Sequence, residues 1–565
     1  NRFSAFVVVK HLKIAMTSWD EKVGGEPADY GNAVLSANGS YTILPEPVKT
    51  FLCNFEAAIR NRNVYDIIQC YEAQFPKLTE RFFAKYNWPA TQVVTEIVSR
   101  SLGGKEPDQL FVILYTEMYY KHIYAHIAGG PSFEDREASY FNYCDFFNFV
   151  LGTDTPVTHE LPYQLLWDII DEFIYQFQNF TQYRAKLKNK KDEEISTLRD
   201  SVTTWNIHSV LNVLHSLVEK SCINEQLREL ASGGDISAVA GEFGERQLYK
   251  MLGFFSLIGL CRLHCILGDF FQALKVLENI DVSRLDLYCN VPTCNITTSY
   301  YVGFSFMMMR RYEDAIRTLN DALAYHNRVK SSLAGRPDVA DYVAKQTDQM
   351  CHLLCLCLSL HPMRVDEIVH AQIKEKYNEK NLKLSRMDLD EIANTFQYAC
   401  PKFLSPVPPN FDLPENYQMN PMRQIKEEFI SEIKQQARIP DIRSYLKLYT
   451  TLSIEKLAGL MNTEPQVLHR ELMCYKHKMQ NIVTADAAAA AAAEAPTASS
   501  SELDFYIDGD MIHVADTKVA RKFGELFIRN ILKLEDVNRA LTRLDQFIYG
   551  VAAGEAGPQA GSARS

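Results

Sequence analysis

The chain has 565 residues, of which 47% are hydrophobic and 23% are charged, the balance of an ordinary globular protein. That length exceeds one compact core, so we expect about two to four domains or an extended array. The formal net charge of −11 excludes binding of nucleic acid by overall charge alone, because phosphate binding relies on clustered Lys and Arg.

The first forty residues lack the apolar pattern of a folded domain. Residues 1–40 are largely polar and rich in glycine from Met16 onward, and we expect them to be disordered. The basic stretch 1–15 is interpreted as leader sequence that is not translated, with the start at Met16. An import peptide is the alternative.

Residues 41–231 predict an N-terminal helical domain that is rich in aromatic residues. Its fragment "HIYAH" places His122 and His126 four apart, as zinc proteases do, but Ile123 stands where their general base Glu would be. The acids Asp168, Asp171 and Glu172 fall opposite the apolar face of the helix "LLWDIIDEFIYQFQNF". We interpret them as the polar face of an amphipathic helix rather than an acid–base pair or a cation site. No catalytic residue is therefore predicted.

The cysteine pattern favours reduced, buried thiols over a metal site. The 13 cysteines include no C-x-x-C pair, and Cys289 with Cys294, the nearest approach to one, lacks a second pair. No glycine-rich stretch has the order of a phosphate-binding loop, so "SGGDISAVAGEFGE" is interpreted as a linker. Neither a metal nor a cofactor is expected, and no apolar stretch approaches the ~20 residues that span a bilayer.

A repeated phrase, aromatic-x-x-Ala-x-x-x-Leu, predicts TPR-like helical repeats over residues 232–330. The two copies align Ala273 with Ala315 and Phe270 with Tyr312. Gly303 stands where tetratricopeptide repeats carry a small residue, which lets paired helices approach closely. Two unrelated helical hairpins are the alternative interpretation.

A further domain is predicted over residues 315–515, with a helical part to about 440 and a winged helix at 441–515. In the winged helix, Ser453 predicts one helix cap, and Thr463 with Gln466 has the pattern of a capping box. The dipeptide Asp508-Gly509 between alternating apolar residues predicts a hairpin. An alanine-rich loop is expected at 485–501. The predicted winged-helix edge for a partner consists of Phe505, Ile507, Ile512 and Val514.

The winged helix also allows RNA contact as an alternative function. Its third helix is locally basic, but 13 Lys and Arg stand against 15 Asp and Glu between residues 441 and 545. A free-standing nucleic-acid reader is usually distinctly basic, so direct RNA binding would be weak. Its candidate residues are Arg470, Lys476 and Lys478.

A long C-terminal helix is predicted at 516–548, followed by a disordered tail at 549–565. Apolar residues recur along this helix at three-four spacing, which predicts a stripe that needs a partner to bury it. The stripe comprises Phe527, Ile531, Leu534, Val537, Leu541, Leu544 and Ile548.

Long strings resemble one particular family. A helical-repeat stack that leads into a winged helix and a trailing helix resembles the PCI domain, which occurs in subunits of several large assemblies. Strings such as "LLWDIIDEFIYQFQNFTQYR", "YYVGFSFMMMRRYEDAIR" and "DFYIDGDMIHVADTKVARKFGELFIRNI" resemble the L-subunit family of eukaryotic translation initiation factor three. The resemblance covers about residues 41–545.

The resemblance implies a non-catalytic scaffold subunit in the cytoplasm. The implied partners are other subunits of initiation factor three, with K and E as neighbours, and the small ribosomal subunit. Contact with mRNA would be weak or indirect, and no membrane contact is implied. A subunit of another PCI assembly, the COP9 signalosome or the proteasome lid, is the alternative.

Overall fold

The computed structural model describes residues 44–84, 86–126, 130–187, 190–201, 203–234, 236–280, 291–329, 337–411, 420–478, 480–482, 497–499, 503–516, 526–535, 537, 538 and 541. The predicted disordered ends and most of the alanine-rich loop lie outside these residues. Two compact units divide the chain: the first ends at Val150 and also includes His159–Pro162, and the second comprises Leu151–Thr158 and the chain from Tyr163 onward. This division falls inside the predicted N-terminal domain of 41–231, whose bounds stay a prediction.

The first unit is helical and is closed by an aromatic core. Trp88 lies at its centre, with ring centroids 4.4 Å from Phe83, 4.9 Å from Phe75 and 5.9 Å from Phe51. The indole N–H of Trp88 donates to the hydroxyl of Thr79 at 3.0 Å, which satisfies its one buried donor. The elements are α2 (Glu46–Arg60), α3 (Val64–Ile68), the π-helix η1 (Gln69–Gln74), α4 (Phe75–Phe82), α5 (Thr91–Ser101), α6 (Gln109–His126) and α7 (Phe133–Leu151).

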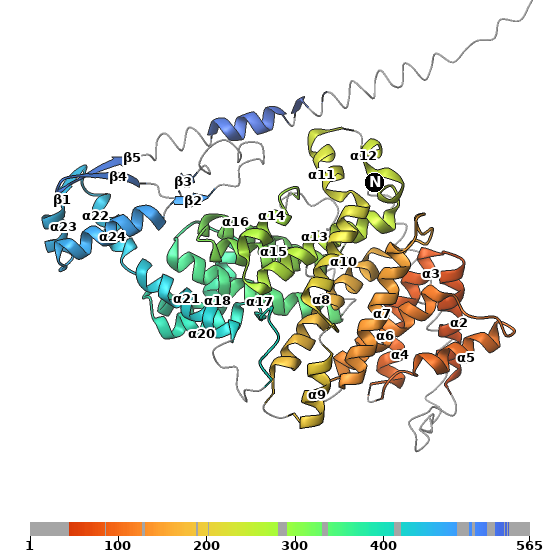
Figure 1. The fold of residues 1–565 in the computed structure, drawn as a ribbon. Coiled ribbons are helices and arrows are strands. Elements are labelled where there is room, and N and C mark those ends of the chain that lie inside the picture. The colour runs from red at the N-terminus through yellow and green to blue at the C-terminus, as the bar shows by residue number, and fades with distance from the viewer. Residues whose placement is uncertain are drawn as a thin grey trace, which may run out of the picture. The chain divides into compact units, whose positions relative to one another are not determined.

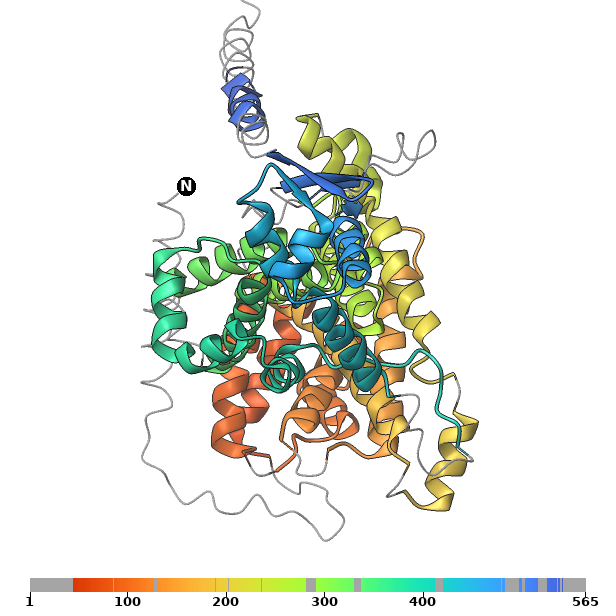
Figure 2. The ribbon, with the colours of Figure 1, turned by 90° about the vertical axis from the view of Figure 1, so that its left-hand side faces the viewer.

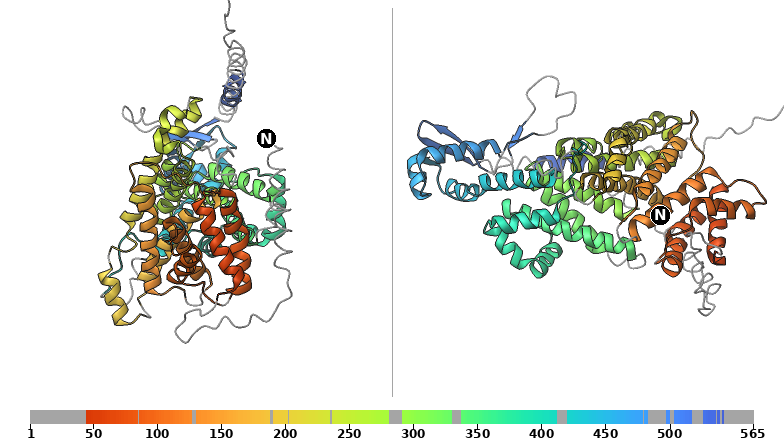
Figure 3. Two further views of the ribbon diagram at one scale, coloured as in Figure 1. Left: turned by 90° about the vertical axis from the view of Figure 1, so that its right-hand side faces the viewer. Right: turned by 60° about the horizontal axis from the view of Figure 1, so that its bottom comes forward.

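The second unit begins with stacked helices that lie side by side in Figures 1 and 3. Its central helix, α13 (Gln247–Leu267), packs against α8 (Tyr163–Ala185), α10 (Ile207–Ser221) and α15 (Pro292–Met308). The other helices are α9 (Asp192–Asp200), α11 (Ile223–Ser232), α12 (Ser237–Gly244), α14 (Phe270–Val276), α16 (Tyr312–Val329), α17 (Pro337–Leu360), α18 (Glu367–Lys376), α19 (Asn378–Ser385), α20 (Leu389–Ala399) and α21 (Pro421–Gln436).

The expectation that no stretch has the length of a membrane span was wrong for α13. This helix is long and apolar enough to cross a membrane, and no other helix in the described part of the chain meets both criteria. However, 83% of its apolar window is buried inside the protein, because helices surround it. Its hydrophobicity is therefore that of a core helix.

The repeated phrase corresponds to two helix pairs, α13–α14 and α15–α16. Ala273 and Ala315 are both fully buried at equivalent places in the second helix of each pair. A Cβ on Gly303 would lie 2.6 Å from Cδ2 of Leu319, so this glycine permits the close approach of α15 and α16. The prediction of a mainly α fold built from helical repeats is confirmed.

A winged helix follows the repeats. Its helices α22 (Ile439–Leu446), α23 (Ile454–Leu460) and α24 (Pro465–Lys478) pack on a sheet with strand order β1-β5-β4, as the end view in Figure 2 shows. The strands are β1 (Thr451–Ser453), β4 (Leu503–Asp508) and β5 (Met511–Asp516), and a second antiparallel pair joins β2 (Gln480–Ile482) to β3 (Thr497–Ser499). Three helices and a β-hairpin in this order are the winged-helix topology.

Two local predictions in the winged helix need correction. Asp508 pairs with Met511, so the two-residue turn is Gly509-Asp510, one position later than Asp508-Gly509. Gly509 supplies the positive φ of 58° that the first position of a II′-type turn requires. The capping box at Thr463 does not form, because Leu468 N–H donates to Glu464 O and the helix starts one residue later. The predicted cap at Ser453 is confirmed, since its hydroxyl accepts from Lys456 N–H at 3.3 Å.

Beyond the winged helix, residues 526–535, 537, 538 and 541 are helical. They lie within the predicted long helix of 516–548, whose remaining residues are outside the described part of the chain.

Candidate interaction surfaces

The predicted histidine pair gives no metal site. His122 is buried, and its Nε2 lies 3.0 Å from the carbonyl oxygen of Tyr86, so the ring is used in packing. The side chain of His126 is outside the described residues. Among the residues that the structure describes, no group of three His, Cys, Asp or Glu side chains is arranged to hold a metal ion.

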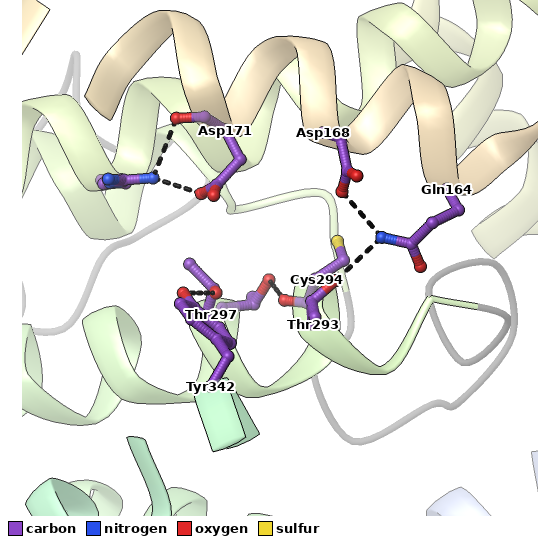
Figure 4. A network of polar contacts seen from close by, with 9 residues as sticks. Gln164, Asp168, Asp171, Thr293, Cys294, Thr297 and Tyr342 are labelled. Carbon is purple, nitrogen blue, oxygen red and sulfur yellow. Dashed lines mark hydrogen bonds and ion pairs between the residues drawn. The ribbon is translucent and has the colours of Figure 1, made fainter. Parts of the chain in front are cut away.

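The acids of α8 are partly exposed and also make contacts within the chain. Asp171 forms an ion pair with Arg262 of α13, and the guanidinium also donates to the carbonyl oxygen of Asp171 at 3.4 Å (Figure 4). Burial acts to lower the pKa of Arg262, but the carboxylate of Asp171 and the neighbouring Tyr301 and Tyr342 outweigh it and raise the pKa. Arg262 is thus a buried, permanent cation in an otherwise apolar helix.

Polar contacts continue from this ion pair along α8 and α15. Gln164 donates to Asp168 at 2.7 Å and lies 3.4 Å from the hydroxyl of Thr293, as Figure 4 shows. On the same helix as Thr293, the hydroxyl of Thr297 lies 2.9 Å from that of Tyr342. These contacts join α8 to both α13 and α15. They also join α15 to α17. They are engaged with one another, so the arrangement supports structure rather than acid–base chemistry.

Most of the described cysteines are buried in the core. Burial raises the pKa of Cys70 and of Cys265 to about 12, and it raises the pKa of Cys261 as well. A thiol with so high a pKa is protonated at neutral pH and is a poor nucleophile or metal ligand. All cysteines that the structure describes are free thiols, as the sequence predicted.

The predicted winged-helix edge faces the domain's own core. Phe505 and Ile512 are buried there, and Ile507 and Val514 pack against the same cluster. Strict alternation along β4 turns Asp504, Tyr506 and Asp508 outward instead. A partner at this edge would therefore meet the backbone of β4 and these outward side chains, not the four predicted residues.

Of the candidate RNA-contacting residues, only Arg470 is freely presented. Lys478 is 5% exposed and its ammonium lies 2.6 Å from Glu432. Lys476 donates to the carbonyl oxygen of Phe505 at 2.7 Å and lies 3.7 Å from Asp504. Two of the three charges are thus engaged within the chain.

The C-terminal helix carries the largest run of exposed apolar side chains in the described residues. Phe527, Ile531, Leu534, Val537 and Leu541 of the predicted stripe are all more than half exposed, while Leu544 and Ile548 lie outside the described part. Leu526, Ile528 and Leu532 are exposed on the same helix and were missed, because the sequence reading kept only the strict three-four positions. They broaden the stripe.

The fold defines a class of protein, an array of helical repeats joined to a winged helix. Residues 135–534 match the family model described as Paf67, RNA polymerase I-associated factor PAF67.

Curated relatives extend the match to most of the chain. Eukaryotic translation initiation factor 3 subunit L of Nematostella vectensis is 50% identical over 507 residues, which cover 90% of this chain and 94% of that protein. The proteins of the same name from Homo sapiens and Xenopus tropicalis are each 47% identical over 528 residues, covering 90% of this chain and 92% of theirs. The chain belongs to the family of initiation factor 3 L subunits.

Proposed function

We propose that this protein is a non-catalytic scaffold subunit of translation initiation factor three in the cytoplasm. As such it would join an assembly that binds the small ribosomal subunit and promotes recruitment of mRNA and initiator tRNA. Its relatives carry the name of an initiation factor 3 subunit. The K and E subunits are the neighbours we propose.

The exposed stripe of the C-terminal helix is the observation that carries this proposal. It follows the completed winged helix, whose core closes without it. A helix with apolar residues around most of its surface is stable in water only when other elements cover it. Exposed apolar patches of this extent mark protein interaction sites. A bundle formed with helices of sibling subunits would cover the stripe.

The RNA-contacting alternative has less support. A winged-helix reader binds through several cations on its third helix, but Lys476 and Lys478 of α24 are engaged with Asp504 and Glu432. Arg470 alone would give a weak, salt-sensitive contact.

Native purification tests the proposal directly. A tagged copy of the chain, expressed at its normal level, is purified under native conditions and its companions are identified by mass spectrometry. We expect initiation factor three subunits in equal stoichiometry, with K and E crosslinked nearby. Recovery of signalosome or proteasome-lid subunits, or of the chain alone, would refute it.

A further inference from the structure

A cluster of polar side chains joins the repeats to the winged helix around one carboxylate. Oε1 of Glu432 on α21 lies 2.6 Å from Nζ of Lys478 at the end of α24 and 3.8 Å from Nη1 of Arg310. The same oxygen accepts from Nε2 of Gln436 at 2.6 Å, and Gln436 in turn bonds the hydroxyl of Tyr312. We call these five residues the Glu432 hub.

The members of the hub come from three separate parts of the chain. Arg310 and Tyr312 belong to the turn and second helix of the α15–α16 repeat, Glu432 and Gln436 to α21, and Lys478 to the winged helix. Arg310 has a φ of 62° at the place where the first repeat has Gly268, with a φ of 90°. A non-glycine residue at positive φ is strained, so its contacts must hold it there.

Much of the hub is shielded from water, although Arg310 is about as exposed as Glu432. Lys478, Gln436 and Tyr312 are buried, and Glu432 is only partly exposed. Burial acts to raise the pKa of Glu432, but Lys478 and Gln436 outweigh it and lower the pKa, so the carboxylate stays ionised. A buried charge that loses its partner is strongly destabilising, because it keeps its desolvation penalty without the compensating attraction. The pair therefore resists separation.

The hub lies where the chain would otherwise hinge. Only Ala437 and Arg438 stand between α21 and the first helix of the winged helix, α22. The core of the winged helix consists of its own residues from Ile439 to Ile512 and does not include side chains of α21. Rotation about this short connection is opposed by the link between Lys478 and Glu432.

We propose that the Glu432 hub locks the winged helix in one orientation on the helical repeats. Through Gln436 and Tyr312 the lock reaches the repeat, so repeats and winged helix move as one body. Domains that lack such a fastening move relative to each other by default. A scaffold needs this rigidity, since a fixed orientation presents its binding surfaces without an entropy cost on assembly.

A distance measurement on the full chain tests the lock. Spin labels are attached through non-natural amino acids at Leu382 of α19 and at Leu448 after α22, both largely exposed. The wild-type protein should give one narrow distance distribution. Lys478→Met and Glu432→Gln should each broaden it about twofold, because the winged helix then samples several orientations.

Two further variants keep the test decisive. Lys476→Met removes the exposed ion pair with Asp504 inside the winged helix, with the same loss of charge, and should leave the distribution narrow. If a single variant fails to fold, the double variant Glu432→Gln with Lys478→Met leaves no unpaired buried charge and should also broaden it. A distribution that is already broad in the wild type, or that stays narrow in the double variant, would overturn the proposal.

Discussion

Placing two carboxylates on the stripe of the C-terminal helix should detach the protein from its assembly. Leu534 and Leu541 are 68% and 54% exposed, so a bundle would bury most of each side chain. Full burial of a leucine is worth about 1.5–3 kcal/mol, and the part still exposed here corresponds to about 1–2 kcal/mol each. Leu534→Asp with Leu541→Asp loses both contributions and adds the desolvation of two carboxylates. A total of at least ~4 kcal/mol weakens binding roughly 10³-fold.

The assay compares sibling subunits recovered per tagged chain, by quantitative mass spectrometry after native purification. The matched control is Arg529→Asp with Lys533→Asp, which adds two carboxylates to the same helix at positions that are not part of the stripe and should retain the siblings. Circular dichroism should be unchanged for both variants, since the stripe lies outside the repeat and winged-helix cores. Normal recovery of all siblings with the leucine variant would show that the stripe is not the binding surface.

Three further outcomes concern the core. Gly303→Val should destabilise the protein to urea by about 1–3 kcal/mol through overpacking, while Gly459→Val, whose added Cβ meets no atom within 4 Å, should not. Burial lowers the pKa of His326 from 6.5 to about 4, so the unfolded chain binds the extra proton. The free energy of unfolding should be constant above pH 6.5 and fall by up to about 3 kcal/mol between pH 6.5 and 4. In urea titrations, the His326→Phe variant should show a smaller decrease over the same pH range. Asp171→Leu removes the carboxylate that pairs with the buried Arg262 cation and should lower the free energy of unfolding by about 3–5 kcal/mol. Arg262→Met should lower it less, because the remaining carboxylate of Asp171 is accessible to water.

The sequence predicted features whose cause is local. The repeat was visible because close helix pairing demands a small residue at fixed spacing, as at Ala273, Gly303 and Ala315. The hairpin of the winged helix was visible because alternating apolar residues flank a glycine turn. Even there the turn was placed one residue early, since strand register is set by pairing with β1 as well as by the turn.

The polar networks were not predictable, because their partners are far apart in the chain. Asp171 and Arg262 are separated by 91 positions, and no periodicity in either helix identifies the other. Asp171 was placed on the polar face of an amphipathic helix, which does not show that it pairs with a buried cation. Lys478 was likewise taken as available to RNA, since a sequence shows that a charge exists but not whether another charge neutralises it.

These engaged charges bear on how the protein recognises partners. Arg262 and Lys478 are both buried cations, and each forms an ion pair with a carboxylate of the same chain. These charges are therefore not available to a partner. Among the described residues, the surface best suited to bind a partner is therefore the exposed apolar stripe of the C-terminal helix. Apolar burial is not screened by salt, whereas exposed ion pairs and phosphate contacts are. If the proposed binding through the apolar stripe is right, the protein should therefore be retained in its assembly at high ionic strength.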